Sequence, residues 1–102
     1  SNFTINHYVL ENIKLNSSYL KYKKEYILNQ NFFDKPHEII FRSLSNILKR
    51  IGNKYYSTRG RSLDQVIKKI KLNNLSKVTL SGCVIEKSNN SLIIYKEIGK
   101  KS

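Results

Sequence analysis

One amphipathic segment near the middle of the chain constrains the fold most strongly. Apolar side chains recur in it at three- and four-residue spacing, and they are Ile40, Phe41, Leu44, Ile47, Leu48 and Ile51. This spacing predicts an α-helix that buries one face. We expect Asp34 to be its N-cap, with Pro36 in the first turn and Glu38 close behind to complement the helix dipole. Gly52 follows the last apolar residue and is expected to supply the C′ position.

Two more helices are predicted, one on each side of this segment. Residues 60–72 repeat the same period with a stripe of Leu63, Val66, Ile67 and Ile70. Residues 4–15 fit a short helix, although their caps are poor. The helix of residues 60–72 and the central helix are therefore expected to face one core.

The remaining segments have residue patterns that predict β-strands. Residues 19–22 and 25–28 are rich in Tyr, Leu and Ile and predict a two-stranded ribbon with a Lys23–Lys24 turn. Residues 77–87 and 92–98 predict a hairpin around the turn of residues 88–91. Gly82 interrupts the alternation and indicates a bulge or a close backbone approach. The expected fold is α+β, a two-helix core with small antiparallel β-ribbons before and after it.

Length favours a single domain over residues 1–102 with a short basic tail at 99–102. The sequence lacks methionine, even at position 1, so the chain begins either at a processed Ser1 or inside a longer gene product. One cysteine excludes an intrachain disulfide and favours a reducing compartment, with the cytoplasm as the expected location. The longest apolar runs are about four residues, far short of the roughly 20 that a membrane span requires, so we expect no membrane association.

Charge is the clearest guide to function. The chain carries 19 Lys and Arg against 7 Asp and Glu, a formal net charge of +12. Positive charge at this density destabilises a compact chain through self-repulsion, and its usual partner is a polyanion. Nucleic acid is the most common such partner, and an anionic membrane is the less common one.

Few residues are suited to catalysis. His7 and His37 lie in different elements without a carboxylate at helical spacing, so packing or surface roles are favoured over metal binding. Cys83 lies between apolar strand residues, which favours a buried thiol over a nucleophile. The four glycines are too far apart to form a phosphate-binding loop. We therefore predict no catalytic residue, no metal site and no cofactor in this chain.

Binding of nucleic acid requires cations with aromatic rings between them, and residues 53–61 have this composition. Arg59 and Arg61 are suited to bidentate phosphate contacts, and Tyr55 or Tyr56 to stacking on a base. Cations on the helix faces add to this surface, and they are Arg42, Lys49, Lys68, Lys69 and Lys71. The alternative is a solvated turn whose tyrosines pack on the core edge, with lysines that only complement helix dipoles.

Several short motifs, read in order, resemble one known family. They are Pro36-His37-Glu38-Ile39-Ile40-Phe41-Arg42-Ser43-Leu44, Leu48-Lys49-Arg50-Ile51-Gly52, Tyr56-Ser57-Thr58-Arg59, Val78-Thr79-Leu80-Ser81-Gly82-Cys83-Val84-Ile85 and Leu92-Ile93-Ile94-Tyr95-Lys96-Glu97. Over residues 19–98 the chain resembles the C-terminal, substrate-binding region of bacterial tRNA(Ile)-lysidine synthases, especially the alphaproteobacterial type.

This resemblance implies a role beside a catalytic domain. The family uses ATP to join lysine to the wobble cytidine of an isoleucine tRNA, and its N-terminal catalytic domain carries an SGGxDS loop that this chain lacks. ATP and magnesium would therefore belong to the parent enzyme, and this chain would bind tRNA. The residues carried over as RNA contacts are Arg42, Lys49, Tyr56, Arg59, Arg61, Lys68 and Lys69.

Two other interpretations remain open at this point. The helix pair and hairpin also fit a free-standing basic nucleic-acid-binding domain with a β wing. The apolar ribbon of residues 92–95 also fits a homodimer that pairs hairpin edges.

Overall fold

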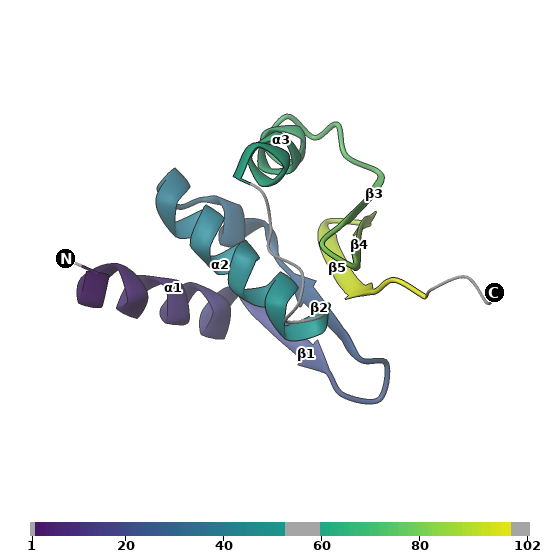
Figure 1. Cartoon of the computed structure of the whole chain (residues 1–102), viewed down its shortest axis with the longest axis horizontal. Helices are drawn as coiled ribbons and strands as arrows, with labels where there is room; N and C mark the ends of the chain where they lie inside the picture. The colour runs from purple at the N-terminus through teal and green to yellow at the C-terminus, as the bar shows by residue number, and fades with distance from the viewer. Residues whose placement is uncertain (1, 53–59, 99–102) are drawn as a thin grey trace.

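The computed structural model describes residues 2–52 and 60–98 (Figure 1). Its elements are α1 (Asn2–Asn16), β1 (Ser17–Leu20), β2 (Glu25–Leu28), the 3-10 helix η1 (Gln30–Phe33), α2 (His37–Ile51), α3 (Gly60–Lys71), β3 (Lys77–Leu80), β4 (Cys83–Ser88) and β5 (Ser91–Lys96). The predicted α+β class is confirmed. All three expected helices form close to their predicted bounds.

The strands form one sheet, and this corrects the expectation of separate ribbons. The strand order is β1-β2-β5-β4-β3, with every neighbouring pair antiparallel. β2 pairs with β5 so that Tyr26 lies opposite Ile94 and Leu28 opposite Leu92. The first ribbon and the last hairpin are thereby joined, although they lie near opposite ends of the sequence.

Strand β5 lies in the middle of this sheet, so residues 92–95 do not offer the free edge that the predicted edge-paired dimer requires. Residues 92–95 are hydrogen-bonded to β2 on one side and to β4 on the other. The edges are β1 and β3 instead. The apolar character of β5 is therefore that of a central strand.

The core lies between one face of the sheet and the helices. Alternate residues of β2, β4 and β5 point into it, among them Leu28, Ile85 and Ile94, each fully buried. The helices supply their apolar stripes, which include Ile40, Leu44, Ile47, Leu63 and Ile67. Each such side chain contributes about 1.5–3 kcal/mol when it is removed from water.

A buried polar network fixes α1 to the rest of the fold. Asn12 Nδ2 donates to the carbonyl oxygen of Phe32 and to Ser43 Oγ, both at 3.2 Å. Asn16 Nδ2 donates in turn to Asn12 Oδ1 at 2.8 Å. A buried amide without partners costs about 1–3 kcal/mol, so these bonds fix which face of α1 packs against α2 and η1.

Helix α2 begins later than predicted. Its N-cap position is Pro36, which makes no side-chain capping bond, and Asp34 instead ends η1. A proline disfavours helical backbone at the residue before it, so the helix does not extend back through Lys35. The 3-10 helix was not expected, and the Asp34 N-cap prediction was wrong.

Residues 77–87 form two strands and not one. Leu80 pairs with Cys83, and the two residues between them have positive φ, 54° at Ser81 and 75° at Gly82. Two positive φ angles define the tight hairpin turn that matches strand twist. Gly82 therefore marks a turn, where we expected a bulge or a close approach. The turn of the first hairpin is also longer than predicted. Strand β1 ends at Leu20, so this turn covers residues 21–24 and not only Lys23–Lys24.

Gly52 allows the end of α2 to approach the β3–β4 turn closely, and it does not form a left-handed helix cap. Its φ is −70°, outside the left-handed region, so the C′ prediction was wrong. A Cβ placed on Gly52 would lie 2.5 Å from the carbonyl oxygen of Ser81 and 3.1 Å from Cys83 Sγ. The end of α2 thus packs directly against the β3–β4 turn.

This contact predicts different responses to alanine at two glycines. Gly52→Ala forces the backbone at Ser81 to move, so we expect a loss of about 1–3 kcal/mol in the free energy of unfolding. Gly60→Ala is the matched control, because its Cβ would meet only Phe41 Cζ at 3.8 Å. Urea unfolding measures both, and equal stability of the two variants would contradict the packing described here.

Candidate nucleic-acid interface

Five of the seven predicted RNA contacts lie in the described part of the chain. Tyr56 and Arg59, like Tyr55, lie outside the described residues. The other five divide between α2, which carries Arg42 and Lys49, and α3, which carries Arg61, Lys68 and Lys69.

The two cations of α2 differ in their surroundings. Arg42 Nε donates to Glu38 Oε2 at 2.6 Å, and 39% of the Arg42 side chain is exposed. An ion pair one turn along a helix partly neutralises this guanidinium. Lys49 is exposed, about 10 Å further along the helix by its rise per residue. Lys49 is thus the freer of the two for an external phosphate.

The cations of α3 are all exposed. Lys68, Lys69 and Lys71 lie in its last turns and Arg61 near its start. Asp64 of the same helix contacts His37 instead, with its Oδ1 2.8 Å from His37 Nε2. This contact links α3 to the first turn of α2.

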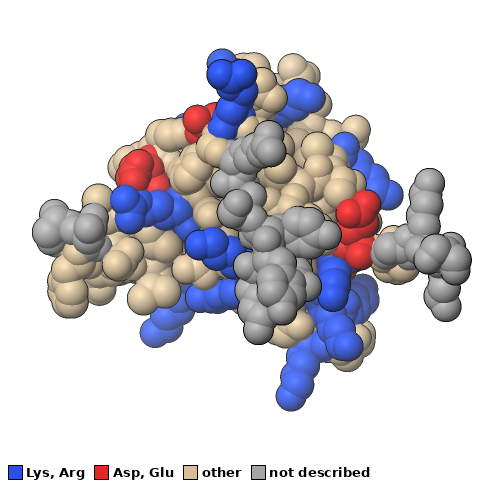
Figure 2. Space-filling model, in the orientation of Figure 1, with Lys and Arg blue, Asp and Glu red and all other residues tan. Residues whose placement is uncertain are grey.

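A third group of cations surrounds the open end of the first hairpin. We call Lys21, Lys23, Lys24, Arg50 and Lys96 the hairpin-end cations, and all five are exposed. Figure 2 shows Lys and Arg side chains gathered in the lower part of the view, around the β1–β2 turn of Figure 1. Figure 1 places α3 at the top of the same view, so the two groups lie on different parts of the molecule.

The sequence alone did not single out the hairpin-end cations, although a signal was present. Three tyrosines, Tyr19, Tyr22 and Tyr26, alternate there with lysines, the same composition that marks residues 53–61. What the sequence did not reveal was the pairing of β2 with β5. That pairing adds Lys96 to this end of the sheet, and the end of α2 adds Arg50.

Few cations have an acidic partner. Among residues 2–52 and 60–98, only Arg42–Glu38 and His37–Asp64 approach within 4.0 Å. The exposed lysines therefore remain available to an external anion. Their attraction to a polyanion is expected to weaken steeply with salt.

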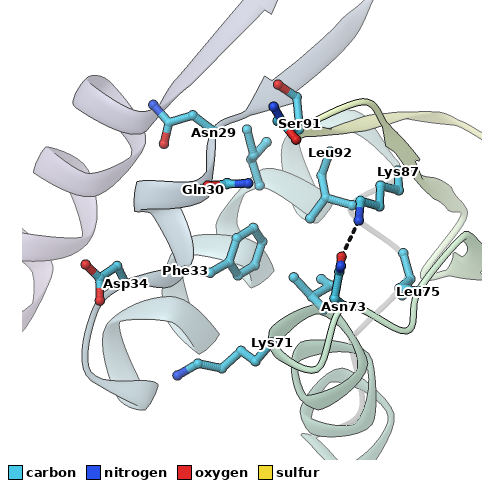
Figure 3. A pocket seen from close by; sticks show the side chains of 13 residues that line it. Asn29, Gln30, Phe33, Asp34, Lys71, Asn73, Leu75, Lys87, Ser91 and Leu92 are labelled. Carbon is cyan, nitrogen blue, oxygen red and sulfur yellow. Dashed lines mark hydrogen bonds between the residues drawn. The ribbon is translucent and has the colours of Figure 1, made fainter.

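A hollow of about 320 Å³ lies between η1, the end of α3 and the β4–β5 turn. Figure 3 shows Phe33 and Leu92 at its centre and Lys87 reaching across to Asn73. Lys87 Nζ donates to Asn73 Oδ1, so this ammonium is already engaged. The lining combines apolar side chains with amides, two lysines and the carboxylate of Asp34.

The described residues contain no cluster of three or more His, Cys, Asp or Glu able to hold a metal ion. Cys83 is fully buried, as predicted, and its thiol donates to the carbonyl oxygen of Leu48 at 3.4 Å. Burial raises the pKa of this thiol to about 11. Within residues 2–52 and 60–98, no helix is long and apolar enough to cross a bilayer.

Comparison with known proteins gives one consistent result. The chain is 37% identical over 70 residues to tRNA(Ile)-lysidine synthase of Rickettsia typhi and 36% identical over 70 residues to that of Rickettsia felis. Each alignment covers 68% of this chain and 16% of the relative. The chain resembles the C-terminal region of tRNA(Ile)-lysidine synthases. The resemblance carried by the sequence motifs is thereby confirmed.

The relatives are much longer than this chain, which spans about 16% of the length of the lysidine synthases it matches. The enzyme of Rickettsia bellii is 36% identical over 64 residues, 63% of this chain. No family model matches the sequence. No solved structure matches the fold.

The environment of Cys83 predicts a protected thiol. With its pKa raised to about 11 from an ordinary 9.0, the folded chain carries roughly a hundredfold less thiolate near pH 8 than the unfolded chain. Iodoacetamide should therefore modify Cys83 slowly in buffer and rapidly in urea. As pH rises from 9 toward 11, the unfolded state loses the thiol proton first, so the free energy of unfolding should fall. Equal alkylation rates in buffer and urea would contradict this burial.

Proposed function

We propose that this chain is a tRNA-binding domain of a tRNA(Ile)-lysidine synthase. It holds the tRNA for a reaction catalysed by another part of the same polypeptide. The observation that carries this proposal is the similarity to lysidine synthases over 68% of the chain. The name of those relatives identifies tRNA as the substrate, and the charge of this chain suits it to bind that substrate.

The surface of the described residues supports this role. Exposed lysines of α3, Lys49 of α2 and the hairpin-end cations lack acidic partners within that part of the chain. Phosphates neutralised by these side chains would release counterions, which supplies affinity without base-specific contacts. Folded RNA is recognised largely through shape and backbone in this way.

The catalytic chemistry belongs to the rest of the parent protein in this proposal. The sequence contains no SGGxDS loop, so ATP and magnesium would bind the N-terminal catalytic domain. That domain and tRNA would be the partners of this chain, in the cytoplasm. Sequencing the gene upstream of Ser1 is a direct check, and an open reading frame without SGGxDS would contradict the assignment.

Binding should be specific to tRNA and sensitive to salt. We expect the purified chain to bind tRNA in dilute buffer, with log affinity falling linearly with log salt concentration. Filter binding or fluorescence anisotropy measures the slope, with duplex DNA as competitor. Stronger binding of duplex DNA than of tRNA would favour the free-standing DNA-binding interpretation. Absence of tRNA binding in dilute buffer would reject the proposal.

Neutral substitutions in α3 test the predicted contacts there. The double variant Lys68→Gln and Lys69→Gln should flatten the salt slope by roughly 0.7 to 0.9 for each phosphate that is no longer neutralised. A control of equal charge is Lys14→Gln with Lys77→Gln, in α1 and β3, where no RNA contact is proposed. Equal slopes for the two double variants would show that α3 does not contact the RNA.

A further inference from the structure

A small pocket lies at the open end of the first hairpin, apart from the residues predicted from sequence. It has a volume of about 210 Å³. Its lining comes from three segments that are distant in the sequence, and the residues are Tyr19, Lys24, Tyr26, Arg50, Ile51 and Lys96. We call it the hairpin-end pocket.

Two tyrosine rings form one side of this pocket. Tyr19 and Tyr26 lie directly opposite each other on β1 and β2, with ring centroids 4.9 Å apart and planes tilted by 47°. Tyr26 packs against the core, and its hydroxyl accepts a hydrogen bond from Arg50 Nη1 at 3.1 Å. Tyr19 is 49% exposed. The fixed ring of Tyr26 therefore supports a ring of Tyr19 that remains open to a ligand.

Three cations complete the lining, and no described acidic residue joins them. Lys24, Arg50 and Lys96 come from the hairpin turn, the end of α2 and the end of β5. None of them takes part in an ion pair with a described residue. The pocket is therefore a site where an anion would replace water around uncompensated positive charge.

The acidic residues of the neighbouring strands point the other way. Glu25 precedes Tyr26 in β2, and successive strand residues face opposite sides of a sheet. Glu86 lies on that same opposite face, where its Oε1 accepts a hydrogen bond from Tyr95 Oη at 2.8 Å. This carboxylate also raises the pKa of Tyr95. The sheet thus separates Glu25 and Glu86 from the three cations of the pocket.

An exposed aromatic ring beside three cations matches the chemistry of a nucleotide. A base stacks on a tyrosine ring, and its phosphate accepts hydrogen bonds from Lys and Arg. The volume is below the roughly 300–1,000 Å³ of a typical cofactor site, so it suits a single base and not a dinucleotide. A base inside a duplex is already stacked on both faces, so only an unpaired nucleotide presents a free face.

We propose that the hairpin-end pocket binds one unpaired nucleotide of the RNA, with the base on Tyr19 and the phosphate among Lys24, Arg50 and Lys96. This inference rests on the proposed RNA-binding function and gives it a specific subsite. The pocket would orient the RNA, whereas the exposed lysines elsewhere would hold it through phosphates alone.

The test uses two RNA hairpins, one blunt and one with a short single-stranded overhang that carries 2-aminopurine. The 102-residue chain should bind the overhang RNA more tightly and quench its fluorescence. Tyr19→Ala should weaken overhang binding by roughly fivefold to 150-fold, the range for one base stacked on an aromatic side chain. Tyr19→Phe keeps the ring and should retain the quenching. Tyr22→Ala is the matched control, because Tyr22 is 83% exposed in the same hairpin and does not line the pocket.

A second variant keeps the test valid even if Tyr19→Ala does not fold. Lys96→Gln alters only an exposed side chain, and it should reduce the overhang preference and flatten the salt slope by roughly 0.7. Full overhang preference in Tyr19→Ala or in Lys96→Gln would overturn the subsite. Equal binding of both RNAs by the unaltered chain would overturn it too, while leaving the proposed function intact. Failure to bind either RNA, or tRNA, would reject the proposed function itself.

Discussion

The pairing of β2 with β5 is the interaction on which the rest of this structure depends. A two-stranded ribbon is marginally stable in water by itself, and β1–β2 becomes part of a larger sheet only through this contact. The register places Leu28 opposite Leu92 and Tyr26 opposite Ile94, so the inward side chains of both strands enter one core. Slippage by one residue would turn Leu28 to the other face and expose it.

A second contact determines where the end of α2 lies relative to this sheet. Gly52 is close to the carbonyl oxygen of Ser81, and the Cys83 thiol donates to the carbonyl oxygen of Leu48. Both contacts join the last turn of α2 to the β3–β4 hairpin. Arg50 lies in that turn and reaches the Tyr26 hydroxyl. Core packing thus positions the guanidinium that lines the hairpin-end pocket.

Sequence patterns predicted the local elements well and their assembly less well. The periodicity around Leu44 and Val66 predicted α2 and α3 because it reflects burial of one helix face. The sheet could not be predicted, because the short apolar runs of β2 and β5 do not specify which strand each will pair with. Gly82 was compatible with a bulge because a two-residue turn and a bulge both favour glycine. The hairpin-end pocket was missed for the same reason as the sheet, since Lys96 approaches Tyr26 only through strand pairing.

The cationic side chains form separate groups on the surface, and composition alone does not reveal this arrangement. Lys24, Arg50 and Lys96 meet around an open tyrosine ring, while Glu25 and Glu86 lie on the opposite face of the sheet. Exposed lysines of α3 form a separate group on another part of the molecule. A folded RNA that contacts both groups would be bound through its phosphates and oriented by one unpaired nucleotide in the pocket.

Mapping of backbone amide shifts by NMR during titration with the overhang RNA tests this account most directly. The changes should centre on Tyr19, Lys24 and Tyr26 of the first hairpin and on Lys96, which joins them only when β2 pairs with β5. Changes confined to α3, with the amides of the pocket residues unaffected, would contradict it.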